Sequence, residues 1–351
     1  MNAPRPIISV AFDEAHERQS DAGIARCAGA LAAALSARED IELIRLGGGT
    51  RLSRGTLKKR LATLRQDFFW YPYAGRRSAR NRAAQVYHCP SPRAPLSAGT
   101  PPLVVTVHDL AVIRFPETLT PWSRVYERAM LPRVVDAADR IIAVSRDTSA
   151  DLQTLLGVPA SKIRVIPNGV DASLFAPKER ERPFPFPYVL FVGTPQPRKN
   201  LGRLASAVKL LSTRGQLLRL VIAGSEGWGE IEMDRSDVTF TGHVSHQRLR
   251  ALYQHAECLA LVSLHEGFGL PALEAMVAGT PVVGARAGAI PEVTGGAAVL
   301  VDPLDIESIA AGIIEATDRR SELVLAGRRR AADFSWTNAA ELTVAVYHEL
   351  A

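Results

Sequence analysis

Cysteine is scarce in this chain of 351 residues, and the few cysteines present follow no disulfide or metal-binding pattern. Cys27, Cys89 and Cys258 are odd in number and far apart, so we expect reduced, mostly buried thiols of a cytoplasmic protein. Long apolar runs are also missing, and a bilayer span needs about 18–20 apolar residues. The first apolar run, Ile7–Phe12, leads directly into two acidic residues and predicts a β-strand, not a signal peptide.

The composition predicts a folded protein of more than one domain. The chain is 47% hydrophobic and 22% charged, which suits sizeable buried cores and argues against disorder. At about 100–200 residues per domain, its length predicts roughly two domains. The proline-rich stretch Pro177–Pro187 is the best linker candidate. We therefore predict an N-terminal domain over residues 1–182, a C-terminal domain over residues 183–336, and a last helix within 337–351.

Short apolar runs alternate with helical patterns in both halves of the chain. This alternation predicts the α/β class, with a parallel sheet in each domain covered by helices on both faces. Two doubly wound, Rossmann-like domains would face each other across a cleft, since such sheets bind ligands beyond the carboxyl ends of their strands. The predicted strands are Ile7–Phe12, Ile41–Leu46, Val86–Cys89, Leu103–Val107, Arg140–Val144, Ile163–Ile166, Tyr188–Val192, Leu218–Ala223, Val238–Phe240, Cys258–Val262, Val282–Gly284 and Ala297–Val301.

Positive charge is concentrated in one segment. Arg51–Arg82 holds ten Arg or Lys residues and a single acid, Asp67, together with five aromatic residues. Basic residues around aromatics suit an anionic membrane surface or a lipid-phosphate acceptor, and nucleic acid is a further alternative that we do not expect as a partner. An ordinary solvated helix and loop explains the segment equally well.

The stretch His265–Val283 shows the clearest candidate site. A buried-strand pattern ends just before Glu266, and a helix pattern begins near Leu270 and contains Glu274. Between them, Gly267-Phe268-Gly269 allows a tight turn and a close approach of the backbone to a ligand. The free N–H groups at the start of a helix bind anions, above all phosphate. Two solvated glutamates in an ordinary strand–loop–helix unit remain the alternative.

Further candidates lie at the ends of other predicted strands. Arg198 and Lys199 follow Gly193-Thr194 and enter the next helix, where two cations are unfavourable unless an anion binds there. His108 follows the strand Leu103–Val107, and Gly23 opens the first helix. Val244 follows a strand whose loop could bind a flat base through its backbone groups.

The chain resembles retaining glycosyltransferases of the GT-B fold, in the large family 4 that uses nucleotide sugars. Bacterial mannosyl and rhamnosyl transferases are the members it resembles most. The resemblance covers most of the chain and rests on TVHDL (Thr106–Leu110), IIAVSRDT (Ile141–Thr148), VIPNGVD (Val165–Asp171), GTPQPRKN (Gly193–Asn200), FTGHV (Phe240–Val244) and the E-x7-E stretch from Glu266 to Glu274.

The resemblance implies a donor pocket in the C-terminal domain. Glu274 would hold the ribose hydroxyls and Glu266 the hydroxyls of the donor sugar, while Arg198 and Lys199 would neutralise the departing diphosphate. Many members have an arginine after the loop glycine where this chain has Thr194, and Arg198 is the candidate to replace it. The implied donor-binding set is Gly23, Gly193, Thr194, Arg198, Lys199, Val244, Glu266, Gly267, Phe268, Gly269, Leu270 and Glu274.

In the N-terminal domain, the resemblance makes His108 the active-site histidine beside the anomeric carbon. With Glu266, Arg198 and Lys199 it forms the implied catalytic set. The C-terminal helix Thr337–Leu350 would cross back onto the N-terminal domain.

The implied reaction moves a hexose from a nucleotide sugar, with GDP-mannose favoured, to a glycan or polyprenyl-phosphate-linked acceptor in surface polysaccharide or glycoconjugate synthesis. No cofactor or metal is expected, in agreement with the lack of an Asp-x-Asp pair to hold a cation. The location would be cytoplasmic, with peripheral attachment to the membrane as an open question. A sugar-nucleotide epimerase, or another enzyme of the same fold, is the alternative.

Overall fold

We analysed a computed structural model of the chain. It describes residues 6–15, 23–47, 57–176, 181–225, 227–229 and 233–351, except for the side chains of residues 57–60. The chain divides into two compact units. The first comprises Met1–Ile113, Trp122–Gly169 and Trp336–Ala351, and the second comprises Arg114–Pro121 and Val170–Ser335.

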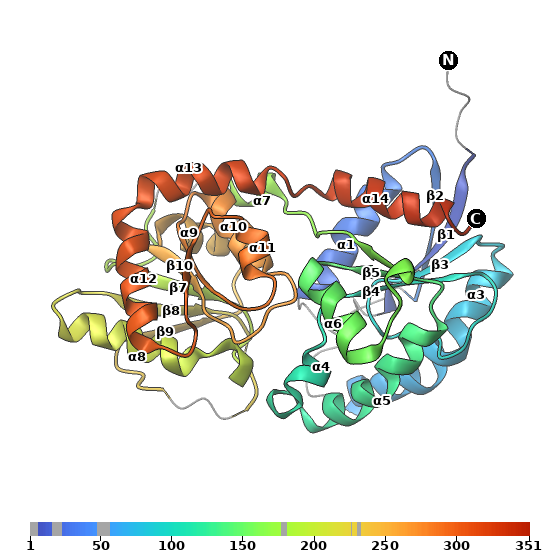
Figure 1. Cartoon of the computed structure of the whole chain (residues 1–351), viewed down its shortest axis with the longest axis horizontal. Coiled ribbons are helices and arrows are strands. Elements are labelled where there is room, and N and C mark those ends of the chain that lie inside the picture. Colours follow the sequence, from blue (N-terminus) through green and yellow to red (C-terminus); the bar gives the residue numbers. More distant parts are fainter. Residues whose placement is uncertain (1–5, 16–22, 48–56, 177–180, 226, 230–232) are drawn as a thin grey trace, which may run out of the picture. The chain divides into compact units, whose positions relative to one another are not determined.

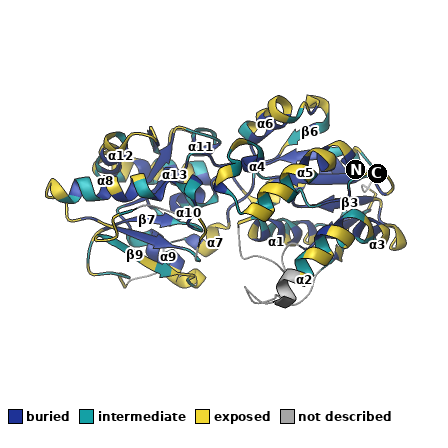
Figure 2. Cartoon of the chain, turned by 90° about the horizontal axis from the view of Figure 1, so that it is seen from below, coloured by how far each residue is buried: buried dark blue, intermediate teal, exposed yellow. Residues whose placement is uncertain are grey.

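The first unit is built on a parallel sheet, six-stranded within the described residues, in the order β2-β1-β3-β4-β5-β6. Strands β3 and β4 are buried along their whole length, as expected for a parallel sheet with both faces covered. The dark blue strands in Figure 2 show this burial. The strands are β1 (Ile8–Asp13), β2 (Ile41–Leu46), β3 (Val86–Cys89), β4 (Leu103–Val107), β5 (Arg140–Ala143) and β6 (Ile163–Val165).

Helices of this unit connect the strands and cover the sheet (Figure 1). One of them, η2, is a nine-residue π-helix that contains Pro72. The helices are α1 (Gly23–Ser36), α2 (Leu57–Arg65), η2 (Gln66–Ala74), α3 (Gly75–Asn81), α4 (Ala111–Arg114), α5 (Pro121–Ala137), α6 (Arg146–Leu156), the 3-10 turn η4 (Ala160–Lys162) and the last helix, α14 (Trp336–His348).

The last helix, α14, is an integral part of the first unit. Tyr347 is fully buried in a core cluster with residues of β1 and α1, and its hydroxyl lies 2.6 Å from Nδ1 of His88. The other ring nitrogen of His88 lies 2.9 Å from Thr106 Oγ1, and burial lowers the pKa of His88 to about 3. Just beyond the helix, Glu349 pairs with Arg140 and Arg164, each at 2.7 Å.

We expect Tyr347→Phe to lower the free energy of unfolding by about 1–3 kcal/mol, because His88 loses a buried hydrogen-bond partner. Tyr347→Ala should cost about 3–5 kcal/mol, because it also leaves a cavity. The measurement is urea denaturation followed by circular dichroism. Leu342→Ala is the control, because Leu342 is exposed on the same helix and its loss should change stability by about 0.5 kcal/mol or less.

The second unit repeats the architecture around a second parallel sheet, in the order β12-β11-β10-β7-β8-β9. Its strands are β7 (Tyr188–Val192), β8 (Arg219–Ala223), β9 (Val238–Gly242), β10 (Cys258–Leu261), β11 (Val282–Ala285) and β12 (Val299–Val301). Its helices are α7 (Ala172–Phe175), α8 (Leu201–Thr213), α9 (His246–His255), α10 (Leu270–Ala278), α11 (Ile290–Thr294), α12 (Ile306–Asp318) and α13 (Arg320–Ala331), with 3-10 turns η3 (Pro116–Thr118) and η5 (Pro197–Lys199).

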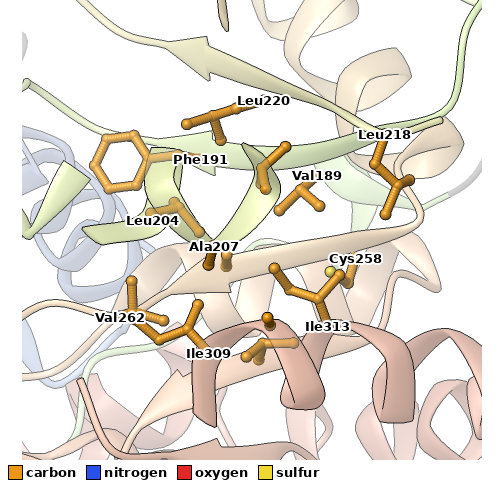
Figure 3. Packing of buried hydrophobic residues seen from close by; sticks show 14 of the residues in the cluster. Val189, Phe191, Leu204, Ala207, Leu218, Leu220, Cys258, Val262, Ile309 and Ile313 are labelled. Atoms are coloured by element: carbon orange, nitrogen blue, oxygen red, sulfur yellow. The ribbon is translucent and has the colours of Figure 1, made fainter. Parts of the chain in front are cut away.

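The main core of the second unit lies between its sheet and the helices α8 and α12. Figure 3 shows Val189 and Phe191 of β7 and Cys258 of β10 facing Leu204 of α8 and Ile309 of α12. Each of these side chains is buried. Buried apolar surface contributes about 25 cal/mol per Å² to stability, so this layer fixes the sheet that carries the loops described below.

The predicted α/β class with two parallel sheets is confirmed, and all twelve predicted strands form within two residues of their predicted ends. The three cysteines are free and buried, as predicted. Among the described residues, no helix is both long and apolar enough to cross a membrane. The basic segment, for which a solvated helix and loop was one interpretation, forms the helices α2, η2 and α3, whose bounds were not predicted. Helix α7 packs with the second unit although it precedes the predicted linker.

Candidate functional site

Two loops predicted to carry a site meet in the second unit because their strands are neighbours in the sheet. Strand β7 pairs with β10, and the carboxyl ends of parallel strands lie at the same edge. The loop after β7 contains Arg198 and Lys199, and the loop after β10 contains Glu266. The backbone N–H of Leu264 donates to the carbonyl oxygen of Arg198 (2.9 Å) and ties the loops together.

Glu266 stands between a buried hydroxyl and two cations. Its Oε1 accepts hydrogen bonds from Lys199 Nζ (2.5 Å) and from Ser263 Oγ (2.6 Å). Arg198 Nη1 donates to the carbonyl oxygen of His265 and lies 3.7 Å from Glu266 Oε2. The two cations belong to η5, a 3-10 turn that leads into α8, and α8 begins at Leu201, close to the predicted start near Asn200.

The charge state of Glu266 follows from these contacts. Burial alone would raise the pKa of its carboxyl group, but the nearby charges of Lys199 and Arg198, with the hydrogen bonds from Lys199 and Ser263, outweigh burial and lower the pKa to about 2. Glu266 is therefore ionised at neutral pH and cannot donate a proton. Its ionised carboxylate fixes the ammonium group of Lys199.

This shift predicts a pH dependence of stability. The pKa of Glu266 is lower in the folded protein than its ordinary value of 4.5, so its stabilising contribution is present above pH 4.5 and is lost as the pH falls toward 2. The difference corresponds to about 3 kcal/mol. In urea denaturation between pH 6 and 3, Glu266→Gln should start less stable than the native sequence and lose less stability on acidification. Parallel curves would contradict this assignment.

The glycine turn after Glu266 positions the start of α10. Gly269 has φ +96° and is the N-cap residue of this helix. A Cβ atom there would lie 2.5 Å from Ile290 Cδ1, so both the backbone and the space require glycine. Gly267 is buried, Phe268 packs edge-on against Phe334 with ring centres 5.8 Å apart, and Leu270 begins the helix.

Glu274 lies one turn into α10 and is almost fully buried. Its Oε2 accepts a hydrogen bond from the hydroxyl of Tyr253 on α9 (2.7 Å). This hydrogen bond from a neighbouring helix holds the carboxyl group in one position. A residue that binds a ligand in a defined geometry needs such support.

The other predicted donor residues lie at the same edge of the sheet. Gly193 and Thr194 directly follow β7 and are half-buried. The N–H of Gly193 donates to the carbonyl oxygen of Ala223 on β8 (2.9 Å). Val244 follows the edge strand β9, two strands away from β7 in the sheet. Strand adjacency therefore groups Gly193, Thr194, Arg198 and Lys199 with Glu266, and places Val244 farther along the edge.

His108 and Gly23 belong to the first unit. His108 follows β4, and its Nε2 lies 2.9 Å from the carbonyl oxygen of Pro90. A carbonyl oxygen only accepts, so Nε2 carries the proton and Nδ1 is the acceptor of the ring. Burial lowers the pKa of His108, which favours this neutral form. Gly23 is exposed at the start of α1, with open space where a Cβ atom would lie.

The basic segment differs from a free cationic surface. Arg76 is buried, and its guanidinium donates to the carbonyl oxygens of Pro101 (3.2 Å) and Ser97 (2.5 Å). Arg80 donates to the carbonyl oxygen of Thr100 (2.9 Å). These two arginines hold the chain between β3 and β4, so reversing their charge would damage the fold. Residues 51–56 lie outside the described residues.

Three supporting residues escaped the sequence interpretation. Ser263 is fully buried beside Glu266, and Tyr253 orients Glu274. Asn200, at φ +60°, donates to the carbonyl oxygens of Val262 (3.0 Å) and Pro303 (2.6 Å). Ser263 could have been noticed as the first polar residue after a buried strand, but nothing in the sequence connects Tyr253 with Glu274.

Comparison with known proteins places both halves of the chain in one group. The model described as "Glycosyltransferase Family 4" matches residues 22–174, and that described as "Glycosyl transferases group 1" matches residues 186–319. The chain is 32% identical over 266 residues to O-antigen chain mannosyltransferase B of Escherichia coli, covering 70% of this chain and 69% of that protein. It is 33% identical over 274 residues to the MMP alpha-(1->4)-mannosyltransferase of Mycolicibacterium hassiacum, covering 71% of this chain and 65% of that protein. Against the D-inositol 3-phosphate glycosyltransferase of Mycolicibacterium smegmatis the identity is 34%, with 61% of that protein covered.

Solved structures share the fold over nearly the whole chain. Sucrose-phosphate synthase of Thermosynechococcus elongatus superposes with a TM-score of 0.71 at 21% identity, covering 98% of this chain and 99% of that one. The Anabaena protein HepE, in complex with UDP-glucose, gives 0.72 at 19% identity, covering 98% and 100%.

Proposed function

The chain belongs to glycosyltransferase family 4, the group 1 glycosyltransferases of the GT-B fold, and we propose that it moves a hexose from a nucleotide sugar to a glycan or lipid-linked acceptor. The observation that carries the proposal is the contact of Lys199 with Glu266 at the carboxyl edge of the second sheet. We propose GDP-mannose as the donor, because relatives from two bacteria are named mannosyltransferases.

In this proposal the second unit binds the donor. Glu274 accepts hydrogen bonds from the ribose hydroxyls, and the backbone of residues 193–194 and 242–244 lies along the nucleotide. The start of α10, with Gly267, Phe268, Gly269 and Leu270, faces the diphosphate, because the N-terminus of a helix favours negative charge.

Lys199 stabilises the leaving group. Departure of the nucleoside diphosphate leaves an oxocarbenium-like sugar and a growing negative charge, which a fixed cation stabilises in the transition state. The hydrogen bond to Glu266 Oε1 orients the ammonium group of Lys199, and an ammonium group can donate to several acceptors, phosphate oxygens among them. Glu266 also accepts from hydroxyls of the donor sugar, and Arg198 adds positive charge behind it.

His108 contributes to the sugar site of the first unit. With its proton on Nε2, the ring offers Nδ1 as an acceptor for a sugar hydroxyl. Because burial lowers its pKa, the ring favours the neutral form that can accept such a hydrogen bond. We propose retention of configuration without a resident metal, with the leaving phosphate taking the proton of the acceptor hydroxyl.

A donor screen tests the proposal. Thermal-shift measurements against UDP-, GDP- and ADP-sugars should show stabilisation by one class of nucleotide, and stabilisation of about 2.7 kcal/mol is expected at a ligand concentration of 100 times Kd. Product analysis with and without an added acceptor then separates transfer from epimerisation, since an epimerase converts the nucleotide sugar alone. No stabilisation by any of the three classes would contradict the proposal.

A further inference from the structure

Three aromatic rings of the first unit form an exposed face at the junction of η2 and α5. Trp122 and Tyr126 of α5 are stacked, with ring centres 5.5 Å apart and planes 9° apart. Phe68 of η2 packs edge-on against both rings, at 6.2 Å and 5.9 Å. Phe68 is 58% exposed and Trp122 is 43% exposed. A contiguous exposed aromatic face of this kind marks a binding site.

Charged groups lie directly beside this aromatic face. Arg93 Nη1 donates to Asp67 Oδ1 (3.0 Å), and Arg93 Nη2 donates to Glu127 Oε1 (3.1 Å). The hydroxyl of Tyr126 donates to the carbonyl oxygen of Asp67 (2.9 Å). Asp67 precedes Phe68 and Glu127 follows Tyr126. The same two helices therefore carry the rings and the acids.

One buried polar atom of η2 has unused hydrogen-bonding capacity. The Tyr71 hydroxyl is buried and has no hydrogen-bond partner among the described residues. The Tyr71 hydroxyl is close enough to Asp13, Arg93 and Asp67 for their charges to act on its pKa. A buried polar group without a hydrogen-bond partner destabilises a fold. Such groups are found more often at functional sites, where a ligand can supply the missing partner.

The acids outnumber the cation in this cluster. Burial raises the pKa of Asp67 despite the opposing effect of Arg93 and of the nearby Trp122 side chain. Burial also raises the pKa of Glu127, and Asp109 adds to that rise. One guanidinium thus pairs with two carboxyl groups, and the carboxyl oxygens are acceptors that suit hydroxyl donors.

The cluster lies at the edge of the sheet where doubly wound domains bind ligands. Trp70 Nε1 donates to Oδ2 of Asp13, the last residue of β1 (2.8 Å), and Arg93 follows the end of β3. Asp109, whose charge reaches Glu127, directly follows His108 at the end of β4. The aromatic face and the acids are therefore connected to the edge that carries His108.

We propose that Phe68, Trp122 and Tyr126, with Glu127 and Arg93, form a subsite for a neutral, hydroxyl-rich sugar ring of the acceptor. The apolar C–H face of the sugar packs on the aromatic face, Glu127 accepts from its hydroxyls, and Arg93 orients Glu127 through its hydrogen bond to Oε1. The side chain of Glu127 is 35% exposed, so its carboxyl group is accessible to a bound ring, whereas that of Arg93 is 14% exposed and supports it from within. This subsite rests on the proposed glycosyltransferase function and assigns the acceptor's sugar, and not its phosphate, to this face.

The test is saturation-transfer difference NMR of the full chain with a panel of neutral di- and trisaccharides and their phosphorylated forms. We expect at least one neutral saccharide to bind, and Trp122→Ala and Glu127→Gln to weaken its binding by about tenfold or more. Phe69→Ala is the matched control, because Phe69 is 56% exposed on the same π-helix but is not part of the proposed subsite. This variant should bind the saccharide as tightly as the native sequence does. Circular dichroism checks that each variant is folded.

Three results would overturn the subsite: no binding by any neutral saccharide, binding unchanged in both Trp122→Ala and Glu127→Gln, or consistently tighter binding of the phosphorylated forms. Sedimentation with phosphatidylglycerol vesicles is the second arm. If Phe69→Ala and Trp122→Ala release the protein from vesicles to the same extent, the face binds a membrane and not a sugar.

The donor screen keeps the two proposals separate. Trp122→Ala should leave stabilisation by the nucleotide sugar unchanged, because the donor residues belong to the second unit. Donor stabilisation without saccharide binding would reject the subsite alone. Saccharide binding without any donor stabilisation would reject the transferase proposal alone.

Discussion

Lys199→Ala is expected to reduce the transfer rate by about 10²–10³-fold, the usual effect of removing one preorganised group that stabilises transition-state charge. The loss should appear in kcat, since the charge on the leaving diphosphate grows only as the bond breaks. The same change leaves Glu266 ionised and buried without its closest cation. Breaking a buried pair in this way costs about 3–5 kcal/mol, so stability should fall together with activity.

A double variant separates these two effects. In Lys199→Ala combined with Glu266→Gln, the uncompensated buried charge is gone, so the thermal midpoint should recover most of its loss. Activity should not recover, because the ammonium group that stabilises the leaving group is still missing. Lys209→Ala is the matched control: Lys209 lies on α8 with its side chain 44% exposed, and its ammonium group is 3.6 Å from Asp237 and 3.8 Å from Asp234. If activity returned with stability in the double variant, Lys199 would be a structural residue and not a catalytic one.

The sheets could be predicted from the sequence because their strands are buried on both faces. Cys258–Leu261 is an uninterrupted apolar run and Leu103–Val107 is apolar except for Thr106, and burial on both faces is what an inner parallel strand requires. The pairing of Lys199 with Glu266 was not predicted. It depends on β7 and β10 being neighbours, whereas β8 and β9 separate them along the chain.

The segment before β3 shows where local patterns fail. Its charge density predicted a solvated or membrane-facing surface, yet Arg76 is buried against the backbone carbonyls of Ser97 and Pro101. Every residue has a backbone carbonyl, so the residue types in the sequence could not identify these partners. The contacts of Asp67 could not be predicted either. Its partner Arg93 lies in the loop after β3, and its aromatic neighbours on α5 lie farther along the chain.

Glu274→Ala is the second large expected effect, and it should act on donor binding. A hydrogen bond to a charged group contributes about 1.5–3 kcal/mol, and a carboxylate can hold two ribose hydroxyls. Each 1.4 kcal/mol is a factor of ten, so we expect the Kd of the nucleotide sugar to rise about 100-fold. Isothermal titration calorimetry with the donor chosen by the thermal-shift screen measures this directly.

The surroundings of Glu274 supply the controls for this experiment. Glu274→Gln keeps an oxygen acceptor for the Tyr253 hydroxyl and the shape of the side chain, so it should weaken donor binding by about tenfold with little loss of stability. Tyr253→Phe removes only the hydroxyl that holds the carboxylate, so donor binding should weaken less than in Glu274→Ala. A Glu274→Ala protein that is destabilised but binds the donor as tightly as the native sequence would show that the carboxylate serves the fold and not the donor. Ribose recognition would then have to come from another residue at this edge of the sheet.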